Sequence, residues 1–99
     1  MIHLTTVVSR KTPLDGRLEI PASLADRLLS AETPLMLSMQ GERSAARLAE
    51  MACTCRKGAG AGHHHHFLES ESLKALSPGA NVSLAIDVDS GLIALHPER

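Results

Sequence analysis

The sequence predicts a single-domain protein of the α+β class that is mainly β, with two short helices. Its 99 residues are enough for one hydrophobic core of modest size, which makes residues 1–99 one domain. Several short segments are rich in β-branched residues or alternate apolar and polar residues, the pattern of half-buried strands. Only two segments, near residues 21–30 and 70–77, carry the start and stop signals of helices.

The first half of the chain is predicted to form three strands and one helix. Pro13 and the Asp15-Gly16 pair give residues 10–16 the chemistry of a turn, and Asp-Gly before an alternating segment predicts a hairpin. Pro21 begins the helix, because proline is tolerated in the first helical turn, and leucines on one face carry it to about Ser30. The strands are Ile2–Ser9, Arg17–Ile20 and Leu35–Met39, the last ending at the Gln40-Gly41 turn.

Residues 42–52 allow two interpretations. Local propensity favours a helix, because alanine is the best helix former and four apolar residues share one helical face: Ala45, Leu48, Ala49 and Ala52. An internal repeat, described below, instead aligns the start of this segment with the predicted strand Leu92–Leu95. We favour a strand that runs from about Ser44 toward Cys55.

The second half is predicted to repeat this order of elements. A strand at His63–Leu68 is followed by a short helix with Ser70 as its N-cap, and Ser77-Pro78-Gly79 ends that helix. Clean alternation predicts a strand at Val82–Val88, and Gly91 turns the chain into Leu92–Leu95. The last four residues, 96–99, are expected to form a tail.

An internal duplication explains this similarity between the halves. The chain matches itself when it is shifted by about 46 to 48 residues, a period long enough for one supersecondary unit. Unrelated segments with the same order of elements would also align their leucines, but they would less readily align a basic dipeptide and a glycine. The predicted repeats are about 1–48 and 49–99, and they align Arg10-Lys11 with Arg56-Lys57 and Gly16 with Gly62.

Composition restricts the class of function. Aromatic residues are 1% of the chain, which disfavours sites built on ring stacking, and a net charge of -1 argues against strong nonspecific affinity for DNA. Hydrophobic residues are 43%, but no apolar run approaches the ~20 residues of a membrane helix. The N-terminus lacks the features of a signal peptide. We therefore expect a cytoplasmic protein, without a membrane partner, that is a monomer or a homodimer.

Residues 16–24, 76–84 and 91–97 resemble motifs of the AbrB/MazE/SpoVT family of transition-state regulators and antitoxins. Residues 16–24, Gly-Arg-Leu-Glu-Ile-Pro-Ala-Ser-Leu, are similar to its "GR-x-x-IP-x-x-L" signature. Residues 76–84 and 91–97 are similar to the strands that follow in that family. The resemblance implies a swapped-hairpin barrel, and two fused copies imply a single-chain, pseudo-twofold cradle-loop barrel from two β-β-α-β-β-like halves, similar to B3-like DNA-binding pseudobarrels.

The same resemblance implies that the protein is a small DNA-binding regulator. In the family, basic residues in the first loop and the arginine of the Gly-Arg pair reach DNA, and a twofold axis would put both basic loops on one side. Cations on loops suit the repeated phosphates of a duplex, and arginine can add bidentate contacts to guanine. The implied DNA-binding residues are Arg10, Lys11 and Arg17, with Arg56 and Lys57 as their counterparts.

A zinc site in the centre of the chain is the second prediction. If the strands on either side of the Gly-Ala run pair so that Cys55 lies opposite His64 and Cys53 opposite His66, all four side chains share one face. Two thiolates and two imidazoles form a competent tetrahedral set. A slip of one residue would present His63 and His65 instead, and small buried wall positions remain the alternative for the cysteines.

The alternative function follows from these features. It is a zinc-binding or protein-interaction module, antitoxin-like, whose barrel edge docks another chain without binding DNA. Catalysis has little support, because the sequence contains no nucleophile elbow, P-loop or paired carboxylates. We therefore do not expect an enzyme, nor a cofactor other than zinc.

Overall fold

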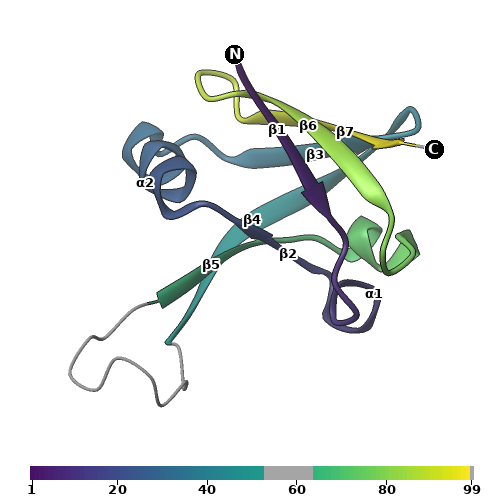
Figure 1. The fold of residues 1–99 in the computed structure, drawn as a ribbon. Coiled ribbons are helices and arrows are strands. Elements are labelled where there is room, and N and C mark those ends of the chain that lie inside the picture. Colours follow the sequence, from purple (N-terminus) through teal and green to yellow (C-terminus); the bar gives the residue numbers. More distant parts are fainter. Residues whose placement is uncertain (53–63, 99) are drawn as a thin grey trace.

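The protein is mainly β, as predicted, in a computed structural model that describes residues 1–52 and 64–98 (Figure 1). The described strands form one sheet in the order β1-β6-β7-β3-β4-β5-β2, which curls around the core as a half-barrel. The strands are β1 (Ile2–Val7), β2 (Arg17–Ile20), β3 (Leu35–Met39), β4 (Glu42–Ala52), β5 (His64–Glu69), β6 (Asn81–Asp87) and β7 (Leu92–Glu98). The helices are α1 (Thr12–Asp15), α2 (Ala22–Ala31) and the 3-10 helix η1 (Glu71–Ala75).

Strand β4 is the longest element, and it joins the two parts of the sheet. Residues 42–46 pair antiparallel with β3, and residues 47–52 pair antiparallel with β5. Residues 42–52 therefore form a strand rather than a helix, because hydrogen bonds to two neighbours outweigh the local preference of alanine. The strand begins at Glu42, before the predicted Ser44, because the turn consists only of Gln40 and Gly41, with φ 52° and 83°.

The predicted hairpin at Asp15-Gly16 is wrong. Strand β1 ends at Val7 and pairs with β6, whereas β2 pairs with β5. Between them Pro13 lies in the first turn of α1, and Gly16 ends that helix with φ 69° and donates its N–H to the Thr12 carbonyl. A glycine with positive φ serves both a hairpin and a helix end, and here the helix forms.

The second half follows the prediction with shifted ends. Strands β5 and β6 lie within one residue of the predicted bounds, and the helix after Ser70 is present as η1. Strand β7 continues through the predicted tail to Glu98 and includes Pro97, which is tolerated because β3 pairs only with residues 92–95. None of the described helices has the length and apolar character needed to cross a membrane.

The strand pairing agrees with a duplication only in part. The hairpins β3–β4 and β6–β7 occupy equivalent positions in the two predicted repeats, and β2 pairs antiparallel with its equivalent, β5. However, β3 and β7 pair in parallel, and β6 and β4 form no matching pair among the described residues. The duplication of residues 1–48 and 49–99, and its pseudo-twofold axis, stay predictions.

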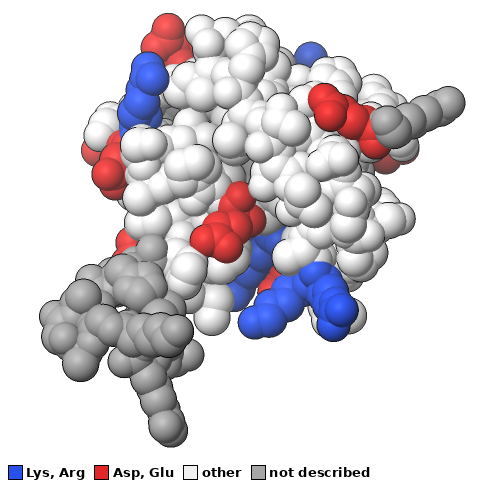
Figure 2. Space-filling view, viewed as in Figure 1, with Lys and Arg blue, Asp and Glu red and all other residues white. Residues whose placement is uncertain are grey.

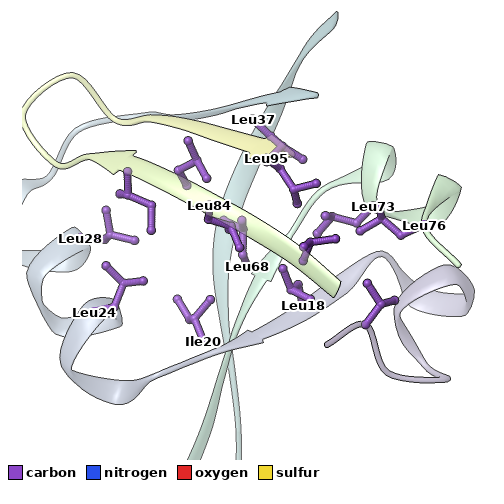
Figure 3. Packing of buried hydrophobic residues seen from close by; sticks show 14 of the residues in the cluster. Leu18, Ile20, Leu24, Leu28, Leu37, Leu68, Leu73, Leu76, Leu84 and Leu95 are labelled. Carbon is purple, nitrogen blue, oxygen red and sulfur yellow. The ribbon is translucent and has the colours of Figure 1, made fainter. Parts of the chain in front are cut away.

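The core fills the inside of the curled sheet (Figure 3). Leu24 and Leu28 of α2 lie at one end, and Leu73 of η1 lies at the other end, where η1 also contacts α1. The remaining buried apolar residues come mostly from alternate positions of the strands: Leu18, Ile20, Leu37, Leu68, Val82, Leu84, Ile86, Ile93 and Leu95. Because alternate residues of β1, β2 and β6 face this core, the neighbouring residues face the surface.

Replacing Gly16 by alanine should destabilise the fold strongly. The change forces an L-residue to φ 69° and sets a Cβ 2.7 Å from the Ser70 carbonyl oxygen. We expect the free energy of unfolding to fall by about 2 to 4 kcal/mol, measured by urea denaturation.

Gly41→Ala is the matched control for this prediction. Gly41 has φ 83°, but no atom lies within 4 Å of the added Cβ. The free energy of unfolding of this variant should fall by only about 1 kcal/mol. Equal losses in the two variants would show that the contact with Ser70 contributes nothing.

Candidate functional site

The candidate site is a groove between the two ends of the curled sheet. Strands β1 and β2 are the first and last strands in the sheet order, and no other described strand pairs with their outer edges. A groove of about 730 Å³ lies between these edges. It is lined by apolar side chains from both strands and by polar and charged side chains from residues 9–17.

The predicted DNA-contacting residues of the first half all line this groove: Arg10, Lys11 and Arg17. Arg10 and Lys11 lie just before α1, their side chains are exposed, and neither has an ion-pair partner among the described residues. Figure 2 shows Lys and Arg atoms gathered at the lower right, where Figure 1 places α1. The structure thus brings these three sequence-predicted cations together.

Arg17 differs from the other two because it is held by an ion pair. Its Nε donates to Glu69 Oε2 at 2.6 Å, and Arg47 binds the other oxygen of the same carboxylate. The register places Arg17 and Arg47 on either side of Glu69, so the three side chains form one row across β2, β5 and β4. Hydrogen bonds from Arg17 and then from Arg47 lower the pKa of Glu69, and Glu69 raises the pKa of Arg17.

The backbone of Arg17 is also fixed by α1. The hydroxyl of Thr12, a buried side chain, donates to the Arg17 carbonyl at 2.8 Å. The Arg17 N–H donates to Asp15 Oδ1 at 3.1 Å. Helix α1 therefore occupies the outer edge of β2 at this residue and sets the position of the preceding basic pair.

The groove wall also contains an acid–imidazole pair that the sequence did not predict. Glu19 Oε2 lies 2.7 Å from His65 Nδ1, and both residues line the groove beside Phe67. On the opposite face of β5, His66 Nδ1 lies 3.6 Å from Glu50 Oε2. The two histidines thus face opposite sides of the sheet, each toward an acidic residue.

Two of the four predicted zinc ligands, His64 and His66, lie in β5. Cys53 and Cys55 are outside the described residues, and so are Arg56 and Lys57. The register behind the prediction is wrong by three residues, because His66 lies opposite Glu50 and His64 opposite Ala52. Within residues 1–52 and 64–98 no three metal-binding side chains gather. Zinc binding by the set Cys53, Cys55, His64 and His66 stays a prediction.

Sequence reasoning missed Glu69, the residue that joins β2, β5 and β4 electrostatically. Its neighbours in space are 22 and 52 residues away in the chain. The available signal was alternation: Glu69 follows the buried Leu68 and so points to the opposite face. Without the register of three strands, that signal does not identify the two arginines.

Comparisons of the chain with protein-family models, with curated proteins and with solved structures found no match. The resemblance to AbrB-like and B3-like proteins therefore stays a prediction from its motifs.

The ion pairs of Glu69 predict a pH-dependent contribution to stability. Since the pKa of Glu69 is lower in the folded protein than in the unfolded chain, this stabilisation is present above the ordinary pKa of a glutamate. It is lost as the pH falls through the lowered value. Glu69→Gln should therefore be less stable than the wild type near neutrality, and the difference should shrink on acidification from about pH 7 to about pH 3.

Urea denaturation at several pH values measures this difference. Glu71→Gln is the control, because the only ion pair of Glu71 among the described residues is an exposed one with Lys74. The free energy of unfolding of Glu71→Gln should differ little from that of the wild type at every pH. If the difference between Glu69→Gln and the wild type does not change with pH, the ion pairs of Glu69 are not the source of the stabilisation.

Proposed function

We propose that the protein is a small DNA-binding regulator that contacts the phosphates of duplex DNA with Arg10 and Lys11 at the rim of the groove. The observation that carries the proposal is the state of these two side chains. They are exposed, adjacent and without an ion-pair partner among the described residues, whereas Arg17 and Lys74 are each paired with a glutamate. Unpaired cations are the groups that can exchange condensed counterions for phosphate contacts.

The backbone around the basic pair supports this role. Val8, two residues before Arg10, exchanges backbone hydrogen bonds with Gly79 and Ala80. Lys11 accepts backbone hydrogen bonds from Leu14 and Asp15. The two cations are thus held between a strand end and a helical turn, which reduces the entropy lost when they bind a phosphate.

Arg17 has a supporting place in the proposal. Its Nε–H is engaged by Glu69, and one terminal nitrogen contacts the sulfur of Met51 at 3.1 Å. A guanidinium has five N–H donors, so donors remain for a phosphate or a base edge without breaking the pair with Glu69. Because Glu69 already neutralises it, Arg17 should add little to the number of counterions released.

The proposal extends to Arg56 and Lys57 through the duplication. We propose that these residues form the second basic contact of a pseudo-twofold barrel, equivalent to Arg10 and Lys11. In Figure 1 the described ends of β4 and β5 lie at the lower left of the molecule, and α1 lies at the lower right.

A salt titration with random duplex DNA tests the proposal. Phosphate contacts from Arg10, Lys11, Arg56 and Lys57 should give a slope of log K against log salt of about −3.6, and Arg10→Ala with Lys11→Ala should reduce the slope to about −1.8. Fluorescence anisotropy with a labelled duplex measures both values.

Arg27→Ala with Arg43→Ala is the matched control. It removes the same charge from exposed positions in α2 and β4, neither of which lines the groove. Its slope should equal that of the wild type. If binding does not depend on salt, or if both double variants reduce the slope equally, Arg10 and Lys11 are excluded as the DNA contact.

A further inference from the structure

The outer edge of β1 pairs with no strand of residues 1–52 and 64–98, and its backbone groups face the groove. Val8 donates its N–H to the Ala80 carbonyl at 2.9 Å and accepts from the Gly79 N–H at 2.8 Å. In an antiparallel ladder such inward-bonded residues alternate with outward-bonded residues. The N–H and C=O groups of His3, Thr5 and Val7 therefore point away from β6, toward the open edge.

Within the part of the chain that the structure describes, this edge has none of the protection that natural sheets give to exposed strands. Strand β1, Ile-His-Leu-Thr-Thr-Val, contains no acidic residue, lysine, arginine or proline and is rich in β-branched residues. Charges, proline and covering loops normally prevent an edge from pairing with another chain. An edge without them is available as a template for an additional strand.

The edge of β2, across the groove, is protected. Thr12 and Asp15 occupy the backbone carbonyl and N–H of Arg17, and the side chains of Arg17 and Glu19 add charge. Strand β2 is also only four residues long. The two edges are therefore unequal: β1 offers the backbone groups of three residues in an uncharged strand, whereas on β2 the backbone of Arg17 is already hydrogen-bonded.

The lining of the groove fits an extended segment with apolar residues and an acidic end. Val7 and Met51 are 57% and 48% exposed at its wall, and Leu4, Ile20 and Phe67 also line it. Arg10 and Lys11 follow β1 at one end of the groove. Apolar side chains of a bound segment would cover the wall, and a carboxylate would meet the basic pair.

We propose that the groove binds an extended acidic peptide segment of a partner protein, which adds to the sheet as a strand beside β1. The main-chain hydrogen bonds would come from His3, Thr5 and Val7, and the preference for acidic residues would come from Arg10 and Lys11. A second copy of β1 fits less well, because Ile2–Val7 contains no carboxylate to face those cations. The proposal does not depend on DNA binding.

The test uses labelled peptides that alternate valine and threonine and carry two glutamates at one end. One probe has the glutamates at its N-terminus and another at its C-terminus, because either strand direction can form the ladder. One of them should bind, and the same peptide with two lysines should bind at least about tenfold more weakly. In Arg10→Glu with Lys11→Glu this preference should reverse.

Thr5→Pro tests the main-chain contact. Proline removes an N–H that points to the open edge and spares the ladder to β6, a position where sheets accept it. Peptide affinity should fall at least about tenfold, whereas Thr5→Val, which keeps the N–H, should bind like the wild type. Unchanged DNA binding in Thr5→Pro would separate this site from the proposed DNA contact.

Amide hydrogen exchange keeps the test valid if Thr5→Pro fails to fold. In the wild-type protein the amides of His3, Thr5 and Val7 should exchange quickly, and the peptide should slow them at least about tenfold, with Leu4 and Thr6 protected throughout. Unslowed amides, or equal affinity for the glutamate and lysine peptides, would overturn the proposal. Protection without peptide, together with a dimer in sedimentation, would identify a second copy as the occupant.

Discussion

The fold depends on one strand that serves two neighbours. The first half of β4 is hydrogen-bonded to β3 and the second half to β5, so the sheet on one side continues into the sheet on the other. Without that continuity β2 and β5 would form a separate small hairpin-like pair, too small to be stable alone in water. Because β4 crosses from one part to the other, the sheet curls, and its first and last strands are left facing a groove.

Electrostatic contacts reinforce this junction at its surface. Glu69 binds arginines from β2 and β4, and these hydrogen bonds lower the pKa of its carboxyl. The pairs lie at the surface, so they fix geometry more than they add stability. These pairs engage Arg17 and Arg47, whereas Arg10 and Lys11, which line the groove, have no ion-pair partner within residues 1–52 and 64–98.

The sequence was a good guide to most elements and a poor guide to their partners. Alternation located β3, β6 and most of β7, and leucine spacing located α2, because those signals are local. Gly16 was misread because hairpins and helix ends both use a glycine with positive φ. The deciding contact, from the Ser70 N–H to the Gly16 carbonyl at 2.9 Å, comes from the other half of the chain.

The same limit applies to the site. The three basic residues of the first half were identified by their motif, but nothing local distinguishes the paired Arg17 from the unpaired Arg10 and Lys11. The partner, Glu69, comes from a strand 52 residues away, and the β4–β5 register, which differs by three residues from the predicted one, sets His66 opposite Glu50. Contacts between distant strands, which local sequence does not encode, decide both outcomes.

The short helix α1 has an effect beyond its four residues. The side chains of Thr12 and Asp15 hydrogen-bond the backbone carbonyl and N–H of Arg17, so these two groups at the outer edge of β2 are not available to β1. The same helix thus limits pairing between the two end strands of the sheet and follows directly after Arg10 and Lys11, the exposed cations that line the groove between them.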